Sequence, residues 1–286
     1  MKKWMTSLYV LATTLMAAAQ TTDSSTLLQT LKAATTDTAR AAAHYQLFLY
    51  YREQDSAAAM LHANQAIALQ QAAGNKSGEA LYLYNKGVFL NINGENEAAT
   101  TLLRQSLQLR QRLDDFAGQG YCLRALGTIE YDKNDYDAAL KLYLEAAPLF
   151  EKGKDLKGLS GVYIWIGNVF NEGLKQFDKA ADYFGKSLDI AKQLKDSALM
   201  SYNYNNLGQS YYYDSNYVKA LEYYQLSKQI KQQLGDERGL GNAYSNLCNV
   251  HYELKDYRRA LAYNDSSLAI RQKQNDKKGM ATCYMN

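Results

Sequence analysis

The chain has 286 residues, enough for one or two globular domains with a sizeable buried core. It is 47% hydrophobic and 21% charged, with a formal net charge of +3, which excludes a strongly basic nucleic-acid scaffold and an acidic disordered chain. A single proline, Pro148, argues against collagen-like and proline-rich chains, and three cysteines are too few for a disulfide framework.

Residues 1–20 have the features of a signal peptide. Lys2 and Lys3 form a charged start, an apolar stretch runs from Trp4 to Leu15, and small residues lie before an expected cleavage site near Ala19. The apolar stretch is short for a membrane-spanning helix. The sequence therefore predicts export, to the periplasm, with a retained anchor and a cytosolic first helix as the alternatives. Residues 21–37 then lead into the rest of the chain.

From residue 38 onward the sequence repeats about every 40 residues. One marker is a small residue, which recurs in steps of 40, 40, 41 and 40 at Gly87, Gly127, Gly167, Gly208 and Cys248. A second marker is an aspartate before each new helical run, at Asp115, Asp155, Asp196, Asp236 and Asp276. An aspartate in that place can cap the helix. The one extra residue falls within 171–177, which we interpret as a turn.

Each unit has the pattern of a helix, a short polar turn and a second helix. In the fifth unit Tyr217, Ala220, Leu221 and Tyr224 follow the i, i+3, i+4, i+7 spacing of one buried helical stripe. No stretch alternates in the manner of a strand. The chain is therefore expected to be all-α, with six units at 38–77, 78–117, 118–157, 158–198, 199–238 and 239–278, and the start of a seventh at 279–286.

These units resemble tetratricopeptide repeats (TPRs). The resemblance is carried by the motif LG-x2-YY-x4-Y-x2-AL-x-YY at Leu207–Tyr224, and by an alanine of the second helix at Ala99, Ala139, Ala180, Ala220 and Ala260. It covers residues 38–286 and implies a right-handed superhelical solenoid of antiparallel helix pairs. The usual 34-residue repeat ends in a proline that is absent here, so the chain resembles the subclass of about 40 residues found in peptide-binding scaffolds and bacterial signalling proteins.

Three places depart from this pattern. The first unit is rich in alanine and irregular, which suits an N-terminal cap. Pro148 lies inside the second helix of the third unit, where we expect it to kink or end that helix. The chain stops at Asn286 within an unfinished seventh unit, so we expect further protein beyond it, with a genuine terminus as the alternative.

The sequence holds no recognisable catalytic constellation. The three histidines, His44, His62 and His251, lack the spacing of a helical metal site, and Gly185-Lys186-Ser187 lies within a predicted helix, where its amides cannot hold phosphate. The three cysteines are explained as small buried residues. We therefore expect no enzyme activity, no cofactor and no metal, and an enzyme is only a remote alternative.

The resemblance implies a concave groove lined by the first helix of each repeat, which holds an extended peptide or a partner helix. Its groove positions correspond here to Tyr121, Arg124, Thr128, Tyr131, Asn168, Asn171, Tyr202, Asn205, Gln209, Tyr212, Asn242, Ser245, Asn249 and Tyr252. Amides can bond a peptide backbone as donor and acceptor, and tyrosines add apolar area with a polar tip. Since only Arg124 is basic, a clamp for a terminal carboxylate is not expected, and a merely solvated surface is the simplest alternative.

These features together predict a non-catalytic scaffold that binds a protein or peptide. The predicted signal peptide and the unfinished repeat favour the exported sensory or interaction region of a larger bacterial signalling protein. The alternative is a self-contained periplasmic adaptor that assembles a complex. Nucleic acid is not an expected partner, because the charge is balanced, and membrane contact is expected only through a segment beyond Asn286.

Overall fold

A computed structural model describes residues 23–285, so the predicted signal peptide lies outside the described residues. The described residues form 14 α-helices and one π-helical turn and contain no strand, which confirms the all-α prediction. They divide into an N-terminal part that ends at Lys133 and a C-terminal part that begins at Asn134, and each is described by itself.

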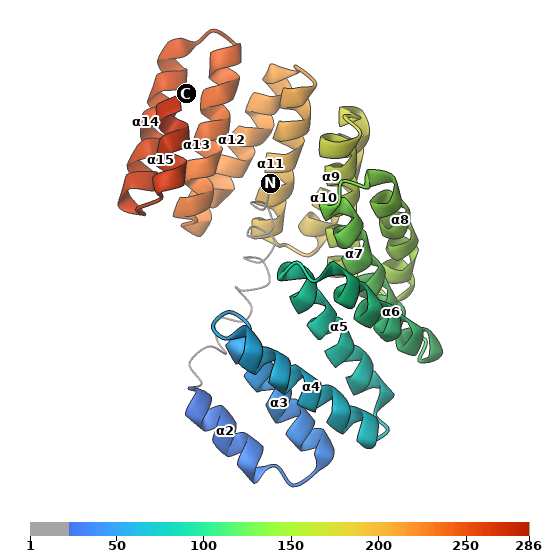
Figure 1. Ribbon diagram of the computed structural model, residues 1–286. Coiled ribbons are helices and arrows are strands. Elements are labelled where there is room, and N and C mark those ends of the chain that lie inside the picture. Colours follow the sequence, from blue (N-terminus) through green and yellow to red (C-terminus); the bar gives the residue numbers. More distant parts are fainter. Residues whose placement is uncertain (1–22, 286) are drawn as a thin grey trace. The chain divides into compact units, whose positions relative to one another are not determined.

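The N-terminal part consists of helices that each pack on the next along the chain (Figure 1). They are α2 (Ser24–Ala33), α3 (Asp37–Tyr51), α4 (Ser56–Ala72), α5 (Lys76–Ile92), α6 (Asn96–Arg112) and α7 (Phe116–Asp132). Helices α3 and α4 form the pair within the first predicted repeat, and α5 and α6 the pair within the second.

The C-terminal part continues in the same manner. Its elements are α8 (Tyr136–Lys152), α9 (Leu156–Asn168), the π-helical turn η1 (Val169–Gly173), α10 (Phe177–Gln193), α11 (Ser197–Tyr213), α12 (Tyr217–Leu234), α13 (Glu237–Glu253), α14 (Tyr257–Lys273) and α15 (Lys277–Met285). The pairs α9 with α10, α11 with α12 and α13 with α14 lie within the fourth, fifth and sixth predicted repeats.

The first helix of each repeat starts at a capping side chain. A carboxylate or amide oxygen accepts the backbone N–H three residues later, at 2.8–3.1 Å, at Asn75, Asp115, Asp155, Asp196, Asp236 and Asp276. Each cap satisfies an N–H group that the helix itself leaves without a partner. The capping role predicted for the recurring aspartates is confirmed.

The turns that follow α4 and the later helices share one backbone feature, a residue in the left-handed conformation. A residue with positive φ follows these helices at intervals of 20 residues, with a single interval of 21. These residues are Gly74, Gly94, Asp114, Asn134, Lys154, Lys175, Lys195, Ser215, Gly235, Lys255 and Asn275. A left-handed residue just after a helix lets the chain reverse while the last carbonyls stay bonded. Most of these positions are not glycine, so their left-handed conformation could not be predicted from the sequence.

The small residue that marks the period lies where the two helices of a repeat approach most closely. A Cβ atom built on Gly208 would lie 2.7 Å from Cδ1 of Tyr224, and one on Gly167 would lie 2.6 Å from Cε1 of Phe184. Tyr224 is 3% exposed and Phe184 is fully buried. The glycine therefore makes room for a large ring from the second helix, and that ring fills the core of the repeat.

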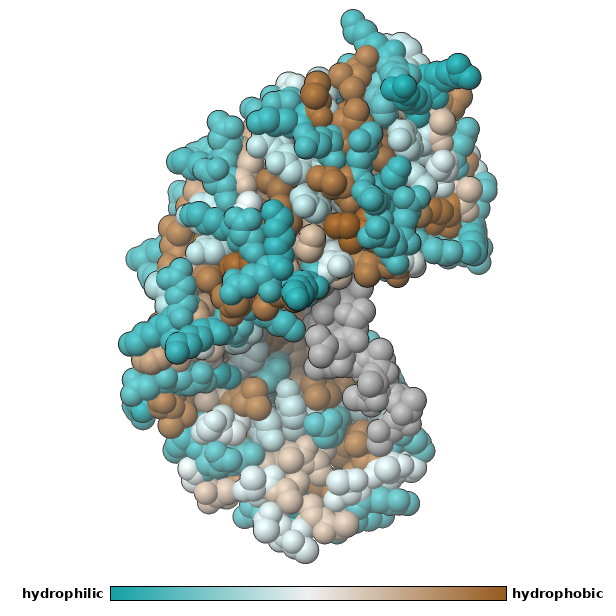
Figure 2. Space-filling model, turned by 180° about the vertical axis from the view of Figure 1, so that it is seen from behind, coloured by the Kyte–Doolittle hydropathy of each residue, from teal (hydrophilic) through white to brown (hydrophobic). Residues whose placement is uncertain are grey.

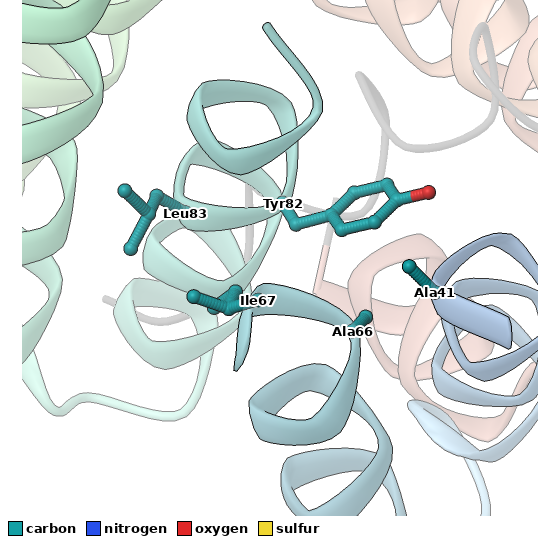
Figure 3. Close-up of a cluster of buried hydrophobic side chains, with 5 residues drawn as sticks. All are labelled: Ala41, Ala66, Ile67, Tyr82 and Leu83. Atoms are coloured by element: carbon teal, nitrogen blue, oxygen red, sulfur yellow. The ribbon is translucent and has the colours of Figure 1, made fainter. Parts of the chain in front are cut away.

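Neighbouring repeats are joined by apolar clusters. In the N-terminal part, Tyr82 of α5 extends toward Ala41 of α3 and Ala66 of α4, with Ile67 and Leu83 beside them (Figure 3). The Tyr82 ring also stacks on Tyr45, with 4.5 Å between ring centroids. This cluster packs the second repeat onto the first.

Buried serines connect the two helices within several repeats. They recur at one place in the second helix, are fully buried, and bond to the start of the first helix: Ser106 to the carbonyl of Ala80 (2.7 Å), Ser187 to the hydroxyl of Ser160 (2.7 Å), Ser227 to the carbonyl of Ser201 (2.9 Å) and Ser267 to the carbonyl of Gly241 (2.9 Å). These bonds help to satisfy hydroxyls that are buried away from water. Ser106 and Ser267 also accept hydrogen bonds from the Nε atoms of Arg110 and Arg271.

Two local expectations need correction. Helix α8 continues through Pro148 to Lys152, so this proline does not end the helix. Ala146, Ala147 and Phe150 are buried on either side of it, and their packing offsets the one missing backbone hydrogen bond. The extra residue of the fourth repeat also does not lie in a simple turn: it is taken up by η1, where the N–H of Leu174 donates to the carbonyl of Val169 at 3.0 Å.

The close approach at Gly208 predicts opposite effects for two glycine-to-alanine changes. Gly208→Ala should lower the free energy of unfolding by about 1–3 kcal/mol, because the added methyl group displaces Tyr224. Gly185→Ala, in α10, should raise it by about 0.5–1 kcal/mol, because nothing lies within 4 Å of the new Cβ and alanine is the better helix former. Urea unfolding followed by circular dichroism measures both, and equal effects would contradict this account.

Candidate binding surface

Helices α11 and α13 are connected by polar side chains on one face of the C-terminal part. The amide of Asn246 donates to the side-chain oxygen of Asn205 at 2.8 Å, and the hydroxyl of Tyr212 donates to the carboxylate of Glu253 at 3.3 Å. Gln209 follows Asn205 by four residues on α11, and Asn249 lies between Asn246 and Glu253 on α13. We call these six residues, Asn205, Gln209, Tyr212, Asn246, Asn249 and Glu253, the amide surface.

A small pocket opens within this surface. It is lined by Gln209, Tyr212, Tyr213, Tyr224, Asn246 and Asn249. Tyr224 is buried, while Tyr213 is 49% exposed and Asn249 is exposed. The pocket therefore offers amide donors and acceptors together with the rings of tyrosines, which is a mixture suited to a polar, uncharged group.

Tyr212 keeps its proton at neutral pH. Burial, followed by the negative charge of Glu253, raises the pKa of Tyr212 to about 12. The hydroxyl can therefore act as the donor in its bond to Glu253 throughout the physiological range. Burial also raises the pKa of Tyr202, on the same helix. Glu253 is the only one of the six residues of the amide surface that carries a charge near pH 7.

Two other predicted groove residues, Asn242 and Ser245, are engaged in packing. The guanidinium of Arg271 on α14 donates to the side-chain oxygen of Asn242 at 3.1 Å and to the hydroxyl of Ser245 at 3.2 Å. It also bonds to Ser267 at 3.0 Å and to the capping carboxylate of Asp276 at 3.0 Å. Ser245 is buried, so this corner of α13 holds α14 and the start of α15 in place.

The remaining predicted residues of the C-terminal part differ in exposure. Asn168 is half-buried at the end of α9, whereas Asn171 lies in η1 and is only 1% exposed, with no hydrogen-bond partner for its side-chain oxygen. Tyr202 is half-buried, and Tyr252 is 57% exposed with its ring edge against Tyr257. Asn171 is therefore not accessible to a partner in this conformation.

Four predicted residues lie on α7 in the N-terminal part. Tyr121, Arg124, Thr128 and Tyr131 are all half-buried. The guanidinium of Arg124 lies 5.0 Å from the centroid of the Tyr121 ring, and that ring contacts Tyr84 of α5 at 6.3 Å. This α5–α7 face is more aromatic and more basic than the amide surface. Of the fourteen predicted groove residues, these four lie in the N-terminal part and the others lie in the C-terminal part.

Sequence reasoning missed four residues that belong to the surface and its pocket: Asn246, Glu253, Tyr213 and Tyr224. The bonds across the surface join residues 41 apart, one more than the repeat, because neighbouring first helices are offset by one position. The 40-residue period alone does not predict these pairs, because each bond joins a residue to the one that follows its equivalent in the next repeat.

The high tyrosine content has a structural explanation in the last three repeats. In each, a ring of the second helix lies between two rings of the preceding segment: Tyr183 with Tyr163 of α9 and Phe170 of η1, Tyr223 with Tyr204 and Tyr211, and Tyr263 with Tyr244 and His251. Five of these six pairs are stacked, and Tyr163 and Tyr183 are tilted by 54°. Centroid distances of 5.4–6.1 Å are typical of packed aromatic pairs.

Within residues 23–285, no group of three or more His, Cys, Asp or Glu side chains is placed to hold a metal ion. All three cysteines are buried and free. No helix among these residues has the length and apolar character needed to cross a bilayer. On the face seen in Figure 2, hydrophilic and hydrophobic residues intermingle.

A family model described as tetratricopeptide repeat matches residues 78–152, 159–233 and 199–273. The matched segments cover more than half of the chain and coincide with the helix pairs described above. The chain belongs to the tetratricopeptide repeat family.

Solved structures of similar fold are numerous. BtubC (BKLC) from P. vanneervenii is 19% identical, with 85% of this chain and 93% of that one covered and a TM-score of 0.60. The apo form of RapI is 15% identical over 96% and 73% of the two chains, with a TM-score of 0.73. The quorum sensor NprR from B. thuringiensis is 15% identical over 91% and 73%, with a TM-score of 0.64. At these identities the likeness concerns the fold; a search of curated proteins finds no match.

The contacts of Arg271 predict that it stabilises the end of the C-terminal part. Arg271→Met should lower the free energy of unfolding by about 1–3 kcal/mol, because it removes four hydrogen bonds of a guanidinium whose side chain is 12% exposed. Arg258→Met, at an exposed position of the same helix, should change it by less than about 0.5 kcal/mol. Urea unfolding compares the two, and similar midpoints for both variants would contradict the prediction.

Proposed function

We propose that this chain is a non-catalytic TPR scaffold that binds a protein or peptide segment on the amide surface of α11 and α13. The observation that carries the proposal is the set of amide and tyrosine side chains around a small pocket on two neighbouring first helices. A surface that served only solubility would be expected to present mostly charged side chains. Of the six residues of the amide surface, only Glu253 is charged.

The chemistry of this surface suits an extended peptide backbone. Gln209 and Asn249 each offer a carbonyl acceptor and an NH2 donor beside the pocket, and a peptide presents both kinds of group in alternation. The rings of Tyr212 and Tyr213 add apolar area that needs little ordering on binding. Binding of this kind reads the backbone and the shape of one side chain rather than a strong charge.

We further propose that the chain is the exported sensory or interaction region of a larger signalling protein. Support comes from the charged and apolar start of the sequence and from the fold, which is shared with NprR, a quorum sensor. A self-contained periplasmic adaptor is the alternative, and it differs in the size and the location of the native protein.

Peptide binding is tested by panning a library of random extended peptides on the immobilised chain. A Gln209→Ala/Asn249→Ala variant should bind the selected peptides at least about tenfold more weakly, equivalent to about 1.4 kcal/mol, because it removes the two amides beside the pocket. Fluorescence anisotropy with a labelled peptide gives the dissociation constants.

The matched control is Gln225→Ala/Arg258→Ala, which changes two exposed residues on second helices of the same part. It should bind as the parent does. Equal affinity of the parent and the Gln209/Asn249 variant, with unchanged circular dichroism, would remove the amide surface from the proposal.

The size and the location of the native protein are tested with an antibody against residues 38–278. The sensory proposal predicts a membrane-bound product much larger than 32.2 kDa in fractionated source cells. A soluble periplasmic band near about 30 kDa, the expected mass after removal of a signal peptide, would support the adaptor instead. A cytoplasmic band would contradict export.

A further inference from the structure

The first repeat contains a pair of histidines that bond directly to each other. Nδ1 of His44, on α3, lies 2.9 Å from Nδ1 of His62, on α4. The ring centroids are 5.1 Å apart, so the two nitrogens lie between the rings and face one another. This is the geometry of an N–H···N hydrogen bond, rather than of two ligands that converge on a third atom.

Such a bond tolerates only certain protonation states. One Nδ1 must carry a hydrogen and donate it, and the other must accept it through its lone pair. One added proton leaves this arrangement possible. When both rings are protonated, two N–H groups of like charge face each other at 2.9 Å, and the bond is lost.

The surroundings of the pair oppose protonation. Burial, and then the charge of His62, lower the pKa of His44, and burial lowers the pKa of His62. The Tyr51 ring stacks on His62, with 5.7 Å between centroids and an interplanar angle of 8°. The Arg40 side chain, one turn before His44 on α3, already bonds to Asp37 at 3.1 Å.

Charged groups on the other elements around the pair are of both signs. Helix α4 contributes none besides His62. The neighbouring segments carry Lys32 on α2, Arg52, Glu53 and Asp55 between α3 and α4, Lys76, Glu79 and Lys86 on α5, and Glu97, Arg104, Arg110 and Arg112 on α6. Lys86 bonds to Asn64, two residues after His62, at 2.6 Å, and Lys76 pairs with Glu79 at 2.8 Å. Among the described residues, no carboxylate bonds to either imidazole.

In the rest of the α3–α4 contact, α4 contributes mostly small side chains and α3 contributes larger ones. The buried residues of α4 are Ala59, Ala63, Ala66, Ile67 and Gln70, so three of the five are alanines. An alanine buries little apolar surface, so most of the apolar area in this contact comes from Leu47 and Phe48 of α3.

We propose that the His44–His62 bond is an acid-sensitive link, which holds α3 against α4 near neutral pH and releases the first repeat as both rings are protonated. The unfolded imidazoles bind protons with their ordinary pKa of 6.5, and the paired ones only at lower pH. The open form therefore takes up more protons, and the closed form loses stability as the pH falls below about 6.5.

The protonation step is tested by NMR on the full chain. Labelling of histidine rings gives three signals, because the chain has three histidines. The signals of His44 and His62 should titrate together in two steps, at least one of them below pH 6.5, since strongly coupled groups share macroscopic pKa values. His251→Gln assigns the third signal. Independent single-step titrations of both rings near pH 6.5 would overturn the proposal.

The opening step is tested by hydrogen–deuterium exchange at pH 7.5 and pH 5.0, corrected for the intrinsic exchange rate. Protection within residues 37–72 should fall at least about threefold more than in α5–α7. A His44→Gln/His62→Gln variant, which cannot titrate, should lose this difference, and the control Gln46→Ala/Gln65→Ala, at exposed positions of the same helices, should keep it. Equal protection of residues 37–72 at the two pH values in the parent chain would refute the link.

Discussion

The structure depends on how closely the two helices of a repeat approach. At Gly167 and Gly208 there is no room for a Cβ atom, because Phe184 and Tyr224 from the paired helix occupy that space. This approach buries the large rings, brings the serines of the second helix within reach of the first, and determines which face of each first helix stays exposed. The amide surface adjoins this contact, since Tyr224, the ring that packs on Gly208, also lines its pocket.

Much of this fold follows from local patterns. The period, the small residue and the capping aspartates are short-range features, because a cap acts over three residues and a helix pair is closed by a short turn. The left-handed turn residues could not be predicted, because Lys154, Lys175 and Lys195 adopt a conformation for which glycine is the usual signal. Pro148 does not end its helix, because the packing of buried neighbours outweighs the low helix propensity of proline at that position.

The candidate surface was predictable in its helices but less so in its members. Gln209, Tyr212 and Asn249, three groove positions that the TPR resemblance implies, line the pocket. The burial of Ser245 and Asn171 could not be predicted from the helical pattern. Ser245 accepts a hydrogen bond from the guanidinium of Arg271 on α14, and Asn171 lies in the π-helical turn η1. The His44–His62 bond could not be predicted from the sequence. It joins residues 18 apart on two helices, and it depends on how each helix is rotated about its own axis.

The one-after-another packing of the helices has a consequence for how the chain acquires its structure. Within each part, every helix packs on the next along the chain, so the contacts that hold a repeat join residues that are near in sequence. Loops closed between such residues lose little chain entropy, and chains of low contact order fold fast. Folding can therefore begin in any repeat and spread to its neighbours.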